Sequence, residues 1–195
     1  MIDDIGVDGF RYYVLADTAY GNDGDFTYEG LVSRYNSDLA NNLGNLAARI
    51  ASVVDKKCAG LGTAPNPDSP LAAFAKDAVA ETSACWHLVQ PSRALEATWS
   101  LIRATNAHLE NHEPWKAEPS DLLNTVMGDA LEALRIVTLL AFPAIPDTAR
   151  EIWRRIGMTT DIEQCRIPVD TEWGLYRAGS PVEKGTPLFP RRTIA

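Results

Sequence analysis

Two asparagines and an arginine form a polar row on a stretch of chain that we expect to be helical. Asn41, Asn45 and Arg49 follow one another at intervals of four residues, which keeps them on one slowly drifting line along a helix. Each amide offers a donor and an acceptor together, and the guanidinium adds a planar fork that can also stack. These groups could therefore read the edges of nucleic-acid bases. The competing interpretation is the solvated face of an amphipathic helix, and spacing alone favours it.

A tryptophan directly after a proline is the second candidate for chemistry. Trp115 follows Pro114 at a break between two helical stretches, which places it at an end of the expected bundle. An aromatic ring there can stack on an unpaired base, a contact worth about 1–3 kcal/mol per base. A tryptophan that plugs the bundle end fits the same position, and packing arguments alone favour that alternative. The other tryptophans are expected in the core or under the tail: Trp86, Trp99, Trp153 and Trp173.

Residues typical of catalysis or metal binding are sparse. His108 and His112 could share a helix face as paired metal ligands, but no third ligand follows at a suitable spacing. The segment 22–25 (Asn-Asp-Gly-Asp) resembles part of a calcium loop without its closing glutamate, so we expect a turn there. The sequence has neither a phosphate-binding glycine loop nor a Gly-x-Ser-x-Gly elbow. Three separated cysteines are expected to pack in the core or tail: Cys58, Cys85 and Cys165.

The elements that must position these residues are helices. Alanine and leucine are frequent and long windows lack proline, which favours the α-helix. Thr27 and Ser120 are expected to be N-caps, and Pro91 suits a helix start. Helices are expected at 7–15, from the Thr27 cap to about 57, at 71–89, at 92–112, from the Ser120 cap to about 140, and at 147–156. The predicted fold is all-α, a bundle of four to five mostly antiparallel helices.

The last stretch of the chain, 158–195, is expected to be an irregular tail. It is rich in proline and glycine and includes a short possible strand at 165–169. We expect it to wrap over the bundle, because four of its apolar residues need burial: Trp173, Leu175, Tyr176 and Phe189.

Charge and composition narrow the class of protein. The 195 residues include 26 acidic and 18 basic ones, a net charge of −8, which argues against a protein that grips nucleic acid, DNA included, by a broad basic surface. The acidity is concentrated in residues 1–28, where six aspartates face only Arg11. Because long apolar runs and a basic leader are missing, we expect neither a membrane span nor a secretory signal. The separated cysteines fit a reducing cytoplasm.

Six separated segments together resemble one family, the C-terminal half of bacterial methionyl-tRNA synthetases. They are Gly-Val-Asp-Gly-Phe-Arg-Tyr-Tyr (6–13), Gly-Asn-Asp-Gly-Asp-Phe (21–26), Tyr-Asn-Ser-Asp-Leu-Ala-Asn-Asn-Leu-Gly-Asn-Leu (35–46), Asn-Ala-His-Leu-Glu-Asn-His-Glu-Pro-Trp-Lys (106–116), Phe-Pro-Ala-Ile-Pro (142–146) and Pro-Leu-Phe-Pro-Arg (187–191). They occur in the family's order and spacing across nearly all of the chain.

The resemblance implies a division into three parts. Residues 1–26 would be a remnant of the stem-contact region, 27–157 the anticodon-binding helix bundle and 158–195 the C-terminal wrapping tail. In this family the bundle reads the CAU anticodon of methionine tRNA. The matching positions are Asn41, Asn45 and Arg49, implied to hydrogen-bond to anticodon bases, and Trp115 after Pro114, implied to stack on the wobble base. The implied partners are methionine tRNA and the catalytic domain of the same enzyme.

Departures from the family pattern concern catalysis. The HIGH-type tetrapeptide, the KMSKS loop and the zinc-bearing insertion do not occur in this sequence. The resemblance therefore implies the anticodon-recognition part of a methionine–tRNA ligase, which attaches methionine to its tRNA with ATP in protein synthesis. ATP and magnesium would belong to the parent enzyme's catalytic domain. We expect no catalytic residue, metal or cofactor in this chain, which should be inactive alone.

One alternative comes from a different class of protein. A stand-alone helical adaptor could bind a protein partner through the acidic surface of residues 1–28. An enzyme acting on a small molecule inside the bundle is a third option, and no convergent set of polar residues points to it.

Overall fold

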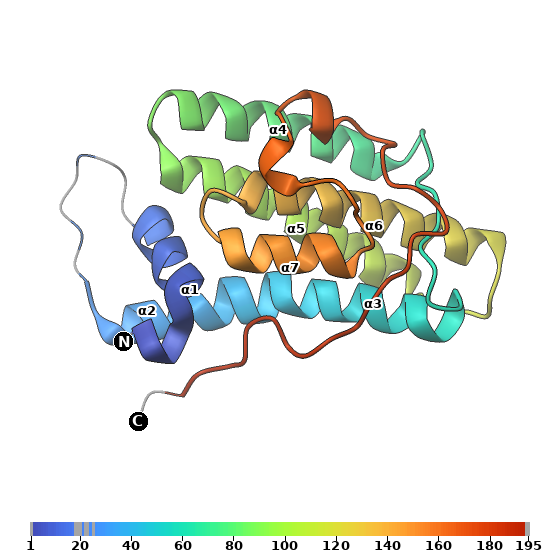
Figure 1. The fold of residues 1–195 in the computed structure, drawn as a ribbon, viewed down its shortest axis with the longest axis horizontal. Helices are drawn as coiled ribbons and strands as arrows, with labels where there is room; N and C mark the ends of the chain where they lie inside the picture. The colour runs from blue at the N-terminus through green and yellow to red at the C-terminus, as the bar shows by residue number, and fades with distance from the viewer. Residues whose placement is uncertain (1, 18–20, 22–23, 25, 194–195) are drawn as a thin grey trace.

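The computed structural model describes residues 2–17, 21, 24 and 26–193, and within them the chain is helical with no strand. The predicted all-α class is confirmed. Among these residues the helices are α1 (Ile2–Asp17), α2 (Tyr28–Arg34), the π-helical segment η1 (Tyr35–Gly44), α3 (Asn45–Lys57), α4 (Pro70–His87), α5 (Pro91–His112), α6 (Asp121–Ala141) and α7 (Pro146–Arg155). Figure 1 shows α3 to α7 side by side, with α1 at one end of the long helix that contains α2 and α3. No helix in this described part is long and apolar enough to cross a membrane.

Two predicted helix starts are confirmed by their capping hydrogen bonds. The Thr27 side chain accepts a hydrogen bond from the Gly30 amide at 3.0 Å, and the Ser120 side chain accepts one from the Leu123 amide at 3.2 Å. Both residues have extended backbone, as N-cap residues do. These bonds set the first residues of α2 and α6, and so the register of everything that follows on each helix.

The long helix departs from the expected uniform α-helix in its middle. α2, η1 and α3 follow one another without a break, because Tyr35 and Asn45 at the two junctions both keep helical dihedrals. Between them, η1 forms the wider turn in which each hydrogen bond spans five residues. Side chains of α5 contact this stretch, and the Trp99 indole nitrogen donates to the Asp38 carbonyl at 3.2 Å. Each residue of η1 therefore turns through a smaller angle about the helix axis than a residue of an α-helix does. The polar row was predicted from the α-helical period of about 3.6 residues per turn.

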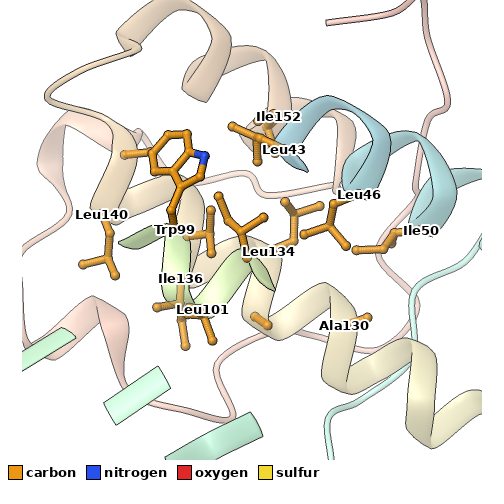
Figure 2. Close-up of a cluster of buried hydrophobic side chains, with 14 of the residues drawn as sticks. Leu43, Leu46, Ile50, Trp99, Leu101, Ala130, Leu134, Ile136, Leu140 and Ile152 are labelled. Atoms are coloured by element: carbon orange, nitrogen blue, oxygen red, sulfur yellow. The ribbon is translucent and has the colours of Figure 1, made fainter. Parts of the chain in front are cut away.

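The core is built around α6. From Val126 to Ala141 every residue of this helix is buried, whereas the other helices bury one face. α6 packs against α3, α4, α5 and α7. Figure 2 shows leucines and isoleucines from η1, α3, α6 and α7 meeting Trp99 of α5. Gly128 allows the carbonyl of Ala64 to approach so closely that any Cβ at this position would clash.

The tail from 158 onward has no strand at 165–169, so that prediction is wrong. Short 3-10 turns flank this stretch, η2 (Ile162–Gln164) before it and η3 (Val169–Thr171) from its last residue onward. Hydrogen bonds between Arg166 and Asp170 fold the segment onto itself, and proline has no amide hydrogen to donate to a ladder. Within the described part, strand-like pairing is limited to one bridge between Leu61 and Pro181.

The expected burial of the tail's apolar residues holds for three of the four. Tyr176 and Phe189 are buried in the main core, and Trp173 packs against it while its indole donates to the Asn66 carbonyl at 2.9 Å. Leu175, in contrast, is 43% exposed, so its expected burial is wrong. Its backbone amide donates to the Glu132 carboxylate at 3.1 Å, while its side chain stays exposed to solvent.

A buried ion pair fastens the tail to α6. Glu132 and Arg135 are both almost fully buried, with Nε of Arg135 2.8 Å from a carboxylate oxygen of Glu132. Glu132 also accepts the backbone amides of residues 174, 175 and 176 at 2.8–3.1 Å. Arg135 donates to the carbonyls of Asp170 and Glu172. Two charges inside the bundle are thus satisfied by the backbone of a segment about 40 residues away in sequence.

Candidate functional site

The polar row lies on the outer side of the long helix. Asn41 and Asn45 are exposed and Arg49 is half-buried, while Leu43, Leu46 and Ile50 beside them enter the core. The division between the two faces follows the sequence pattern. Asn41 stands near the end of η1, whereas Asn45 and Arg49 belong to α3, so the row crosses the change from π to α geometry.

Arg49 links the long helix to α5 through three contacts. Its Nη2 lies 2.7 Å from a carboxylate oxygen of Glu110, and its Nη1 donates to the Asn106 side-chain oxygen at 3.4 Å. Its guanidinium carbon lies 4.6 Å from the centroid of the Trp115 ring. Stacking of a guanidinium on an indole and pairing with a carboxylate restrict the same side chain from two directions. The arginine is therefore held in place before any ligand arrives.

Trp115 is presented by the turn that ends α5. Glu113 adopts a left-handed backbone conformation with φ of 41°, and its amide closes the last helical turn on the Leu109 carbonyl. Pro114 is buried behind the turn, and the Lys116 amide returns to the Glu113 carbonyl at 2.8 Å. Trp115 itself is 37% exposed. Arg49 covers the indole on one side, and the ring does not belong to the buried core cluster.

Asn106 and Glu110 complete this corner of the molecule, and the residue patterns alone did not assign them a role. They are four residues apart on α5 and both face Arg49. Asn106 also donates to the Asn42 carbonyl at 3.5 Å and to the Ile102 carbonyl at 3.2 Å, which ties α5 to the end of η1. Their i, i+4 spacing was a usable signal, but only the packed structure reveals that this face of α5 meets the arginine.

The two asparagines of the row differ in their surroundings. The Asn41 side-chain oxygen accepts a hydrogen bond from Nη2 of Arg191 at 2.6 Å. The Asn45 amide has no hydrogen-bond partner among the residues described, and it borders a cavity of about 210 Å³ between α3 and the tail. Pro114 is close to neither asparagine in sequence and contributes by shaping the turn before Trp115. The structure thus brings Arg49 and Trp115 into direct contact. It places Asn41 and Asn45 on the long helix of Arg49, toward its N-terminal end.

The histidine pair has no metal-binding geometry. The rings of His108 and His112 lie 4.5 Å apart between centroids, and Nδ1 of His112 is 2.8 Å from the His108 carbonyl oxygen. Within the described residues no three His, Cys, Asp or Glu side chains converge as metal ligands would. Burial, followed by the charge of His112, lowers the pKa of the His108 imidazole. The His108 imidazole therefore lies on the side of α5 that faces Asp129 of α6.

Three acidic side chains near the N-terminus are described, and each has a partner within the chain. Asp8 is buried and accepts the Thr148 amide at 2.6 Å at the start of α7, Asp4 accepts the Tyr28 hydroxyl, and Asp17 pairs with Arg34. Positions 22, 23 and 25 of the predicted turn and the side chain at position 3 lie outside the described residues. Asp8 thus holds the start of α7, and Asp4 and Asp17 connect α1 with α2.

Comparison with known proteins first gives a class. Residues 1–51 match the family described as tRNA synthetases class I (M). These residues cover α1, α2, η1 and the first half of α3, and so include the whole polar row. The beginning of the chain is therefore similar to a class I tRNA synthetase.

The particular relatives are methionine–tRNA ligases. The ligase of Fusobacterium nucleatum is 32% identical over 197 residues, which cover 97% of this chain and 31% of that relative. The ligase of Thermotoga maritima is 34% identical over 193 residues, covering 95% of this chain and 30% of that relative. The crystal structure of apo methionyl-tRNA synthetase from Mycobacterium tuberculosis superposes with a TM-score of 0.88 at 29% identity, over 100% of this chain and 40% of that one. The chain is thus homologous to methionyl-tRNA synthetases and spans 30–31% of the length of the two ligases.

Proposed function

We propose that this chain reads the CAU anticodon of methionine tRNA for a methionine–tRNA ligase, which attaches methionine to its tRNA with ATP. The observation that carries the proposal is the contact between Arg49 and Trp115, with the guanidinium 4.6 Å from the ring centroid and the indole 37% exposed. A guanidinium held in place next to a partly exposed indole ring suits an unpaired base, because such a base offers a flat surface for stacking and an edge for hydrogen bonds.

The two asparagines extend the same surface along the helix. Amides read base edges well because each presents a donor and an acceptor. Asn45 keeps both groups free among the described residues, while Asn41 uses its oxygen for Arg191. The proposed reading site therefore consists of Asn41, Asn45, Arg49 and Trp115, with Pro114 shaping the turn that presents the indole. Because the chain carries a net charge of −8, contacts with RNA phosphates are local to this site.

Aminoacylation itself would take place on a catalytic domain that holds ATP and magnesium, which we place outside the 195 residues of this sequence. That domain is the second proposed partner, and the cytoplasm the proposed site of action. Correct docking of the anticodon would help position the acceptor end of the tRNA through linkage between the two sites. The chain alone is expected to bind RNA without catalysing any step. Methionine-dependent ATP–pyrophosphate exchange by the purified chain would contradict this part of the proposal.

The binding test uses two RNA hairpins that differ only in the loop. One carries CAU and the other has the C replaced, and both are titrated at low salt because phosphate contacts weaken steeply as salt rises. We expect tighter binding to CAU. The preference should disappear in Asn45→Ala and Trp115→Ala, whereas Asn124→Ala, an exposed asparagine on α6, serves as the matched control. Equal binding of both hairpins by the unmodified chain would contradict the proposal.

A further inference from the structure

The C-terminal segment is held against η1 in a defined register. The Phe189 ring is buried and meets the Tyr35 ring edge-on, with centroids 5.8 Å apart at 87°. Arg192 follows Phe189 by three residues, and its backbone makes two hydrogen bonds with the Asn36 side chain. The Asn36 side-chain amide donates to the Arg192 carbonyl at 2.8 Å and accepts from the Arg192 amide at 2.9 Å. Figure 1 shows this last part of the tail running beside the long helix. With anchors on both sides, the residue just before Arg192 has little freedom to shift along the helix.

That residue is Arg191, and it reaches the first member of the polar row. Its Nη2 donates to the Asn41 side-chain oxygen at 2.6 Å, across 150 positions of sequence. An exposed asparagine without such a partner can rotate its amide and present either the oxygen or the nitrogen to a ligand. With the oxygen engaged by an arginine, the amide nitrogen and its two hydrogens remain for an incoming base. The bond therefore fixes the orientation of the amide and leaves both of its N–H groups available as donors.

We propose that Arg191 is a positioning residue that fixes Asn41 as a hydrogen-bond donor, so that the C-terminal segment takes part in setting RNA specificity. The inference rests on the proposed anticodon-reading function. A donor at this place accepts bases that present an acceptor atom and rejects bases that present an amino group, because the two donors would then face each other unpaired. Specificity at one base of the loop thus depends on a residue 150 positions away from the one that touches it.

A simpler role for Arg191 is a contact with an RNA phosphate, and the two roles have different signatures. A phosphate contact strengthens binding to every RNA alike, and its loss reduces the salt slope by about one unit. A positioning role changes the ratio between matched and mismatched RNAs at a single base. The ratio of affinities is therefore the informative quantity, and the absolute affinity is the control.

The experiment titrates the full chain with the CAU hairpin and three hairpins in which one loop base is changed at a time. For Arg191→Ala we expect discrimination to fall by about threefold to tenfold at one of the three bases and to stay unchanged at the other two. Arg191→Gln removes the charge but retains an amide that can donate to Asn41, so it should restore that discrimination. Arg177→Ala removes an equal charge from an exposed position of the tail and should leave all ratios unchanged.

A double variant tests whether Arg191 acts through Asn41. Because positioning has no effect once its target is gone, Arg191→Ala added to Asn41→Ala should cause no further loss of discrimination. The inference is overturned if Arg191→Ala weakens all four hairpins equally, if its effect adds to that of Asn41→Ala, or if the ratios do not change. If the unmodified chain fails to prefer CAU, the proposed function itself fails and the inference falls with it. Preference in the unmodified chain with unchanged ratios in Arg191→Ala removes the inference alone.

Discussion

The guanidinium of Arg49 stacks over the indole of Trp115, with its central carbon 4.6 Å from the ring centroid, although the two residues come from opposite sides of α5 in sequence. Glu110 holds the same guanidinium at 2.7 Å from one carboxylate oxygen. The stack is thus formed by a residue of α3 and a residue of the turn after α5, and α5 itself holds the arginine through Glu110. Both side chains are therefore restricted before RNA binds. They lose less conformational freedom on binding, and such a loss otherwise weakens association.

Trp115 is expected to matter for RNA binding and little for folding. For Trp115→Ala we predict a loss of about 1–3 kcal/mol in binding to the CAU hairpin, the worth of one stacked base. Because the side chain is 37% exposed, the melting temperature should hardly change. Hairpin titration and thermal unfolding of the same samples measure both quantities. A large drop in melting temperature would mean that the indole supports the bundle end instead.

Arg49 is expected to act through the shape of its side chain as well as its charge. Arg49→Lys keeps the charge but loses the planar fork and its stacking on Trp115, so discrimination between hairpins should fall by about 1–3 kcal/mol. The matched control is Arg103→Lys on α5, where the arginine pairs with exposed Glu96 outside the site. If Arg49→Lys binds and discriminates like the unmodified chain, charge alone accounts for this position.

Glu132 is expected to stabilise the attachment of the tail. Glu132→Gln leaves the buried Arg135 guanidinium without its counter-charge, which should lower the free energy of unfolding by about 3–5 kcal/mol. Urea denaturation measures the change, and Glu118→Gln, at an exposed position before α6, is the control. A loss below about 1 kcal/mol would show that solvent or a rearranged backbone replaces the missing charge.

His108 is expected to make the fold less stable in mild acid. Burial and the neighbouring His112 lower the pKa of His108 in the folded chain, so the unfolded chain binds more protons as the pH falls through the ordinary value of 6.5. This group therefore has no effect on stability well above that pH and destabilises the fold below it. Nearby Asp129 of α6 acts in the opposite direction on the pKa and reduces the effect.

Urea denaturation at about pH 7.5 and pH 5.5 measures this dependence. The part due to His108 should disappear in His108→Gln and persist in His87→Gln, an exposed histidine on α4. The pKa of Glu151 is lowered to about 2, mainly by its hydrogen bond with Arg154. The stability that Glu151 contributes to the fold is lost only at more acid pH, so it does not affect the comparison between about pH 7.5 and pH 5.5. An identical pH dependence in the unmodified chain and in His108→Gln would contradict the assignment.

Local signals in the sequence were sufficient to predict the helices. Thr27 and Ser120 mark real helix starts because capping depends on a side chain and an amide only three residues away. The tail was predicted poorly, since its conformation depends on distant partners. Residues 174–176 donate their amides to Glu132, which no local pattern connects with them. The same dependence explains why a strand was wrongly expected at 165–169 and why Leu175 is exposed.

The candidate site shows the same limit. The spacing of Asn41, Asn45 and Arg49 was enough to place them on one helix face, although the π-helical stretch before Asn45 was not foreseen. Its hydrogen bonds depend on packing against α5, where Trp99 and Asn106 donate to carbonyls of η1. Glu110 and Arg191 entered the site only through tertiary contacts, one from α5 and one from the far end of the chain. Whether the row reads RNA stays a prediction.

The most direct test of the central claim follows the five tryptophan indole N–H signals by nuclear magnetic resonance during titration with the CAU hairpin. Trp153 and Trp173 serve as internal controls, because each indole already donates to a backbone carbonyl, at 2.8 Å and 2.9 Å. We predict that the Trp115 signal shifts on binding and that those two signals do not. A saturating titration in which the Trp115 signal stays unchanged, or in which Trp173 shifts in its place, would contradict the account.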